Sequence, residues 1–178
     1  MEHKYFIYGV PGVGKTTFAS TFAKQHNYKY LELDYLRIKS QKTTIREKEP
    51  FIYEYSTEAW KKFGELSIDT AVEGFLAVRK AFQKYIALEI AQFNEDLIAE
   101  AVYIDPLVAK TLKSKVTLII TSDEKLHYSH FFLHRDNSNE EDMQFKAARY
   151  IQSFLIKEAR DLNIEIIDNN HLNIKFLS

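Results

Sequence analysis

The sequence predicts an α/β protein in which helices cover both faces of a five-stranded parallel sheet, giving three layers. Two observations support this prediction. Short apolar segments of strand type alternate with helical segments along the chain, which is typical of parallel strands joined by crossover helices. The first apolar segment also runs directly into residues 9–16, Gly-Val-Pro-Gly-Val-Gly-Lys-Thr, which match the phosphate-binding pattern Gly-x-x-x-x-Gly-Lys-Thr.

The individual elements follow from local periodicity. Strands are expected at 3–8, 28–33, 97–102, 116–121 and 164–167. Helices are expected at 15–25, 57–62, 67–93, 123–134 and 141–161. The polar stretch 39–50 is interpreted as a mobile connection within one fold, because the flanking pieces are too small to fold separately. The chain of 178 residues is therefore predicted to form a single domain, 1–178.

The segment 9–16 predicts a binding site for the phosphates of ATP. Its glycines let successive backbone N–H groups point into one concavity, and the helix that follows adds positive potential there. Lys15 is expected to reach the β- and γ-phosphates, and the Thr16 hydroxyl to hold Mg²⁺ against the same oxygens. The residues of this loop predicted to contact ATP are Gly9, Pro11, Gly12, Val13, Gly14, Lys15, Thr16 and Thr17.

Composition narrows the range of partners. The formal net charge of −1 gives no global basic field for nucleic acid. No apolar run reaches the roughly 18 residues that span a membrane, and the first strand leaves no room for a signal peptide. The chain has no cysteine, which excludes disulfides and thiolate metal sites and fits a reducing compartment. We therefore expect a cytoplasmic protein, monomeric or homodimeric, that binds a small metabolite rather than nucleic acid or a membrane.

Weaker motifs follow the loop in an informative order. They are Tyr-Ser-Thr-Glu-Ala-Trp at 55–60, Leu-Ile-Ala-Glu at 97–100, Ser-Asp-Glu at 122–124, Tyr-Ile-Gln-Ser-Phe-Leu at 150–155 and Ile-Asp-Asn at 167–169. With these motifs the chain resembles the P-loop small-molecule kinases, and within them the 2-phosphoglycerate kinase-like group with its relatives, the archaeal mevalonate 3-phosphate 5-kinases. The resemblance implies a P-loop NTPase fold of the nucleotide-kinase-like type with a lid near 134–142. It also implies ATP and Mg²⁺ as cofactors and a small phosphorylated or carboxylated hydroxy acid as phosphoryl acceptor.

The sequence leaves the acceptor open. After Glu100 the family pattern leads us to expect Gly-Val-His, whereas this chain has Ala101, Val102 and Tyr103. Mevalonate 3-phosphate is slightly preferred over 2-phosphoglycerate, because the mevalonate 3-phosphate 5-kinases resemble this chain in their compact size. A regulatory P-loop ATPase that acts through a protein partner is the alternative from another functional class.

Phosphoryl transfer needs cations around the γ-phosphoryl group and a carboxylate near the acceptor hydroxyl. Asp34, at the end of the second predicted strand, is the catalytic and substrate-binding candidate for that hydroxyl, with a helix N-cap as its alternative role. Arg37 is expected to bind a substrate anion unless it is an ordinary solvated arginine. Glu100 ends an apolar strand and is expected to hold Mg²⁺, partly through water, and to border the substrate.

Further candidates lie in the last third of the chain. Arg135 begins a polar break between two helices and is predicted to be a catalytic cation of the lid that contacts ATP, with surface solvation as the alternative. Arg149 is expected to bind a substrate anion, with a surface ion pair as the alternative. Asn169 follows the last strand and is a candidate adenine contact. His127 shares a helical face with two later histidines, for which substrate or lid contacts are expected rather than a metal site.

Overall fold

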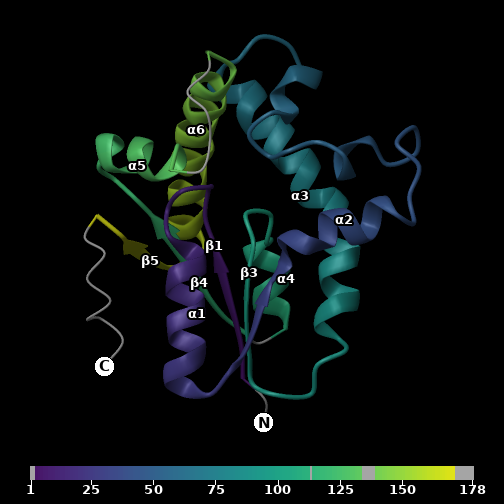
Figure 1. Ribbon diagram of the computed structural model, residues 1–178, viewed down its shortest axis with the longest axis vertical. Coiled ribbons are helices and arrows are strands. Elements are labelled where there is room, and N and C mark those ends of the chain that lie inside the picture. Colours follow the sequence, from purple (N-terminus) through teal and green to yellow (C-terminus); the bar gives the residue numbers. More distant parts are fainter. Residues whose placement is uncertain (1–2, 113, 134–138, 171–178) are drawn as a thin grey trace.

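A parallel sheet of five strands runs through the centre of the protein, as Figure 1 shows for a computed structural model of the chain. The structure describes residues 3–112, 114–133 and 139–170. The strands are β1 (Lys4–Tyr8), β2 (Lys29–Glu32), β3 (Leu97–Glu100), β4 (Lys115–Ile120) and β5 (Glu165–Asp168). They lie in the order β2-β3-β1-β4-β5, and every neighbouring pair is parallel. The predicted α/β class with a five-stranded parallel sheet is confirmed.

The helices differ from the sequence-based expectation in three places, one of which is a short helix over Leu36–Gln41, where no helix was expected. Their bounds are α1 (Lys15–His26), α2 (Leu36–Gln41), α3 (Ile68–Ile90), α4 (Pro106–Thr111), α5 (Glu124–Phe131) and α6 (Asn139–Asp161). Helix α4 was not predicted, because six residues are too few to show a periodicity. It begins where the Asp105 carboxylate accepts hydrogen bonds from the N–H groups of Leu107 and Val108. The segment expected as a helix at 57–62 forms a 3₁₀ turn over Ala59–Lys62.

The two faces of the sheet carry different helices. On β1, the ring of Tyr5 packs against Phe22 of α1, with the ring centres 4.9 Å apart. Side chains alternate along a strand, so Tyr8 points to the opposite face. There the charges of Arg79 on α3 and Glu158 on α6 act on the Tyr8 hydroxyl. Helix α1 therefore covers one face, and α3 and α6 stand together on the other, which gives the three expected layers (Figure 1).

Helix α3 supports the segment that precedes it. Its first turn is fixed by a capping box, in which Ser67 and Thr70 each bond to the other's backbone N–H. Gly74 then lets the 3₁₀ turn approach the helix closely, because a Cβ atom on it would lie 2.5 Å from the backbone nitrogen of Trp60. Residues 59–62 are consequently held against the side of α3.

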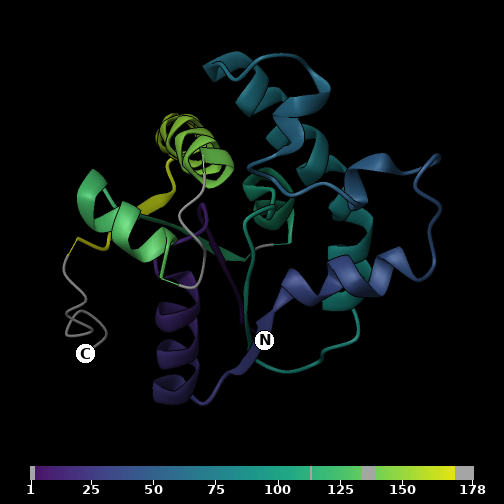
Figure 2. The ribbon, with the colours of Figure 1, turned by 45° about the horizontal axis from the view of Figure 1, so that its top comes forward.

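The carboxyl ends of the strands meet at one edge of the sheet, where ligands bind in open α/β folds. Glu100 at the end of β3 lies level with Ile7 of β1 and Glu32 of β2. The loop that follows β1 therefore sits beside Glu100. Figure 2 shows that α5 lies on one side of this edge and α2 with the residues after it on the other. Of the helices in the described part of the chain, none combines the length and apolar character needed to cross a bilayer.

Candidate active site

The loop between β1 and α1 has the backbone shape of a phosphate site. Gly12 has a φ of 83°, in the left-handed region, and a Cβ atom there would lie 3.0 Å from the backbone of Phe131 in α5. Val10 and Val13 are fully buried and anchor the loop from below. Helix α1 begins at Lys15 and has no acidic residue in its first turn. Its positive N-terminal end is therefore free to attract an anion into the loop.

Lys15 is held inside this loop. The residue is 7% exposed, and its Nζ atom donates a hydrogen bond of 3.2 Å to the carbonyl oxygen of Val10. A phosphate oxygen is a stronger, charged acceptor than this carbonyl. This hydrogen bond thus keeps the Lys15 amine inside the loop, where the motif places the lysine for contact with phosphate.

Glu100 forms the acidic side of the site together with two hydroxyl groups. Its Oε1 accepts hydrogen bonds from Thr16 Oγ1 at 2.8 Å and from the Tyr30 hydroxyl at 3.2 Å. The residue is 1% exposed. Burial raises the pKa of the Glu100 carboxyl above its usual range, and the negative charges of Asp34 and Glu32 add to this, whereas Lys15 and Thr16 lower it. A buried carboxylate in this position is stabilised by a nearby cation.

The Thr16 and Glu100 pair fits a hard divalent cation. The Thr16 hydroxyl gives its proton to Glu100, which leaves its oxygen lone pairs available to a metal. Hydroxyl and carboxylate oxygens are the ligands that Mg²⁺ prefers, usually together with phosphate and water. Over residues 3–112, 114–133 and 139–170, no group of three His, Cys, Asp or Glu side chains is arranged to hold a metal by itself. The pair would therefore hold Mg²⁺ jointly with a bound nucleotide.

Asp34 lies near several of these groups but makes no helix cap. It belongs to the 3₁₀ turn Leu33–Tyr35, whose N-cap is Glu32, while Tyr35 is the N-cap of α2. The alternative interpretation of Asp34 as an N-cap is therefore wrong. The side chain is exposed, and its charge raises the pKa values of Glu100 and of Tyr103. Asp34 is thus an exposed carboxylate beside the acidic side of the site, close to the Tyr103 hydroxyl.

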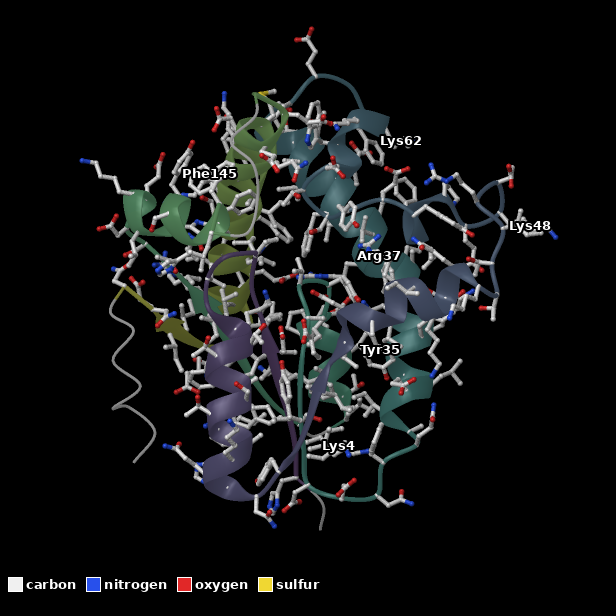
Figure 3. The ribbon with its side chains drawn as sticks, viewed as in Figure 1. Lys4, Tyr35, Arg37, Lys48, Lys62 and Phe145 are labelled. Carbon is white, nitrogen blue, oxygen red and sulfur yellow. The ribbon has the colours of Figure 1, made fainter. Side chains whose placement is uncertain are left out.

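Arg37 is a partly buried cation, seen between α2 and α3 in Figure 3. Its NH1 atom donates to the carbonyl oxygens of Ile52 at 3.1 Å and Glu54 at 2.5 Å. The guanidinium also lies over the rings of Tyr55 and Phe82, at 4.7 and 5.2 Å from their centres. Burial lowers its pKa, and among the described residues no carboxylate comes within salt-bridge distance of it. The charge is held in place but not neutralised.

Arg79 provides the contrast to Arg37. It is 3% exposed on α3 and forms two parallel hydrogen bonds to the Glu158 carboxylate, at 2.6 and 3.0 Å. This pair joins α3 to α6 and neutralises the cation. This ion pair was not predicted from the sequence, because the partners are 79 residues apart and no local pattern links them. Arg79 therefore has a structural role, whereas no carboxylate of the described residues neutralises Arg37.

The P-loop rests on α5 and α6 through two side chains. His127 Nε2 lies 2.9 Å from the carbonyl oxygen of Pro11, and His127 Nδ1 lies 3.4 Å from Arg149 NH1. Arg149 also donates to the carbonyl oxygens of Thr121 at 2.8 Å and Ser122 at 3.3 Å, at the end of β4. Arg149 makes no ion pair with an acidic residue of the described part of the chain, although the alternative interpretation required one. Its role as a substrate anion contact stays a prediction.

The remaining predicted residues outside the segment 9–16 are Asn169, Thr17 and Arg135. Asn169 follows β5, and its Nδ2 atom donates to the carbonyl oxygen of Val13 at 3.0 Å, so it contacts the P-loop directly. Thr17 is exposed on the first turn of α1. Arg135 lies outside the described residues, as does the part of the predicted lid at 134–138. Residues 139–142 of that lid form the first turn of α6.

An apolar cavity of about 810 Å³ lies away from this site. It is found at the amino ends of β1 and β4, between α3 and α4, where Phe6, Ile86, Ile90, Ile104 and Leu112 line it. Because the P-loop is at the opposite ends of the strands, this cavity does not belong to the candidate active site.

Known proteins of similar sequence are kinases. Residues 5–125 match the family model described as "ATPase family associated with various cellular activities (AAA)". A mevalonate-3-phosphate 5-kinase of Thermoplasma acidophilum is 31% identical over 134 residues, which are 70% of this chain and 64% of that protein. A 2-phosphoglycerate kinase of Methanopyrus kandleri is 27% identical over a region covering 94% of this chain and 56% of that protein. The chain thus spans less than two thirds of the length of either relative.

The fold has counterparts among solved structures. A shikimate kinase from Bacteroides thetaiotaomicron superimposes with a TM-score of 0.54 at 18% identity, covering 98% of this chain and 93% of that chain. At this level of identity the likeness concerns the fold alone. It confirms the nucleotide-kinase-like architecture that the order of motifs predicts.

Proposed function

The chain belongs to the ATPase family associated with various cellular activities, and we propose that it is an ATP- and Mg²⁺-dependent small-molecule kinase. It transfers the γ-phosphoryl group to a hydroxyl of a small, anionic hydroxy acid. One observation favours this over hydrolysis alone. Arg37 is partly buried and held by carbonyl groups, yet its charge is not neutralised by a carboxylate of the described chain. Such a cation is suited to the anionic group of an acceptor.

Each residue of the site has a part in this reaction. Lys15 stabilises the charge on the transferring phosphoryl group. Thr16 and Glu100 hold Mg²⁺, which neutralises phosphate oxygens when it is bound. Asp34 accepts the proton of the acceptor hydroxyl as that oxygen forms its bond to the γ-phosphorus and the bond to ADP breaks. Arg37 fixes the acceptor through its carboxylate or phosphate.

Three further roles complete the proposal. Arg135 supplies a second cation to the γ-phosphoryl group, as the resemblance implies. Arg149 binds an anion of the substrate or nucleotide, and Asn169 borders the adenine from its position beside Val13. These roles complete a site in which positioning and electrostatics supply the catalysis without a covalent intermediate.

The preferred acceptor is mevalonate 3-phosphate. The Thermoplasma relative that carries this activity in its name is more similar in sequence than the Methanopyrus one. Mevalonate 3-phosphate also combines the carboxylate, phosphate and hydroxyl that the proposed roles of Arg37 and Asp34 require. The alternatives are 2-phosphoglycerate as acceptor, or a regulatory ATPase that acts through a protein partner.

An acceptor-dependent assay separates these possibilities. ADP formation is measured with Mg-ATP alone and then with mevalonate 3-phosphate, mevalonate, 2-phosphoglycerate or glycerate, and products are identified by mass. We expect a large rate increase with mevalonate 3-phosphate, loss of that rate in Lys15→Ala, and slow hydrolysis without acceptor. Equal rates with and without every acceptor would instead favour the regulatory ATPase.

Arg37 gives the assay its specificity test. Arg37→Met should raise the KM for the acceptor about 10- to 100-fold, the equivalent of one charge-assisted hydrogen bond. The KM for ATP should stay within about threefold. Arg46→Met is the matched control. Arg46 follows α2 in the chain and also lies over a tyrosine ring, that of Tyr53, but it is exposed. Equal effects of the two substitutions would refute the role given to Arg37.

A further inference from the structure

His127 is buried directly beneath the P-loop. It is 0% exposed and lies among the rings of Phe131 and Phe145, whose centres are 6.3 and 5.1 Å from its own. Both of its ring nitrogens have a partner, namely the Pro11 carbonyl and the Arg149 guanidinium. No role in the reaction proposed above accounts for this imidazole.

The two contacts fix its protonation. A guanidinium group can donate hydrogen bonds but cannot accept them, so Nδ1 of His127 must be the acceptor of the Arg149 contact. Nε2 then carries the proton and donates it to the Pro11 carbonyl, at 2.9 Å. The structure thus defines a neutral ring with one tautomer.

We propose that His127 is a positioning residue of the P-loop, which orients the Pro11–Gly12 peptide so that its N–H group faces a bound phosphate. In a trans peptide the C=O and the following N–H point in opposite directions. His127 draws the Pro11 carbonyl toward α5, so the Gly12 N–H points away from α5, into the loop. The inference rests on the proposed nucleotide site but not on the identity of the acceptor.

Arg149 makes this arrangement rigid. Its guanidinium bridges His127 to the carbonyl oxygens of Thr121 and Ser122, so the imidazole is tied to the end of β4 as well as to α6. An unpaired carbonyl or imidazole nitrogen in this buried place would be costly. The three groups therefore lock one orientation of the loop before a nucleotide binds, which reduces the cost of ordering it.

The chain offers a matched control in Gln152. This residue is also buried on α6, at 3% exposed, and exchanges hydrogen bonds with the backbone N–H and C=O of Thr121 at 3.3 and 3.0 Å. It anchors the end of β4 as Arg149 does, but among the described residues it forms its hydrogen bonds with Thr121 and not with the P-loop. Gln152→Met therefore removes a buried polar anchor of similar kind without touching His127.

The test measures the affinity for ADP by calorimetry, which needs no acceptor. His127→Phe keeps a ring in place but removes both hydrogen bonds, and we expect a Kd raised about tenfold. His127→Gln should stay within about threefold of the parent, because its amide nitrogen is as many bonds from the Cβ atom as Nε2. Gln152→Met should lower the midpoint of chemical denaturation but leave the Kd unchanged.

The outcomes separate positioning from packing. An unchanged Kd in His127→Phe, or the same increase in Gln152→Met, overturns the proposal. Should His127→Phe not fold, the imidazole ¹⁵N spectrum of the parent decides, since it must show a protonated Nε2 and an unprotonated Nδ1 at pH 7. The opposite tautomer or an imidazolium overturns the inference. If ADP binds as expected while no acceptor is phosphorylated, the proposed function fails and this inference stands.

Discussion

Acid should destabilise this protein in a way that depends on His127. Burial, together with the nearby charges of Arg149, His130 and Lys15, lowers the pKa of the imidazole from its ordinary value of 6.5 to about 4. Only the hydrogen bond to Pro11 acts in the other direction. In the unfolded chain the ring gains a proton near pH 6.5, whereas in the folded chain it does so near pH 4.

The size of the effect follows from linkage. The unfolded state binds more protons than the folded state between pH 6.5 and about 4, so the free energy of unfolding falls as the pH is lowered through this range. At 1.36 kcal/mol per pKa unit the full contribution is about 3 kcal/mol. About 2 kcal/mol of it should be lost between pH 7 and pH 5.

Urea denaturation of the parent and of His127→Gln at pH 7 and pH 5 measures this contribution. Carboxylates titrate in the same range, and the raised pKa of Glu100 favours the folded state as the pH falls, so the parent alone is not informative. The difference between the two proteins isolates His127, and we expect the variant to lose about 2 kcal/mol less. His26→Gln, at an exposed histidine on α1, is the control. Equal losses in the parent and His127→Gln would show that the buried ring does not stay neutral.

Two further substitutions test other parts of the structure. Glu100→Gln should lower Mg²⁺-dependent turnover at least about 100-fold, because the amide is a poorer ligand. The free energy of unfolding at pH 7 should not fall, since a buried charge is removed. A magnesium titration measures the turnover and urea denaturation the stability, and a preserved turnover would contradict the metal role. Gly74→Ala should destabilise the fold by about 1 to 3 kcal/mol, because the clash with the backbone of Ala59 and Trp60 exceeds the gain of about 1 kcal/mol in helix propensity. A denaturation midpoint equal to the parent's would mean that the 3₁₀ turn moves away at little cost.

Local patterns made the sheet and the P-loop predictable. Strand alternation, helical periodicity and the spacing of glycine and lysine are read within a few residues, and the structure places Lys15, Thr16 and Glu100 together as expected. Helix α4 was missed because its start depends on one cap, Asp105, and its length shows no period. Bounds of the longer helices shifted by a few residues, since capping rather than periodicity decides where a helix ends.

The roles of single polar residues were less predictable, because distant partners decide them. Arg37 and Arg79 both lie in helices of the structure, and the sequence does not show which group each of them contacts. Glu158 neutralises Arg79, and the carbonyl groups of Ile52 and Glu54 hold Arg37. The helical face of His127 could be predicted from the sequence. Its contact with the Pro11 carbonyl could not, because the two residues are 116 positions apart.

Helix α6 lies between the P-loop side of the candidate site and the side that carries α3 and Arg37. Arg149 and Glu158 are nine residues apart, which is two and a half helical turns, so their side chains leave opposite faces of the helix. One face holds His127 and the P-loop, and the other holds Arg79 on α3, the helix that also packs Phe82 against Arg37. Figure 2 shows α6 between α5 and α3, as these contacts require. In the proposed reaction, the distance between a nucleotide at the P-loop and an acceptor at Arg37 therefore depends on α6, whose buried alanines at 147, 148 and 159 allow close packing on both sides.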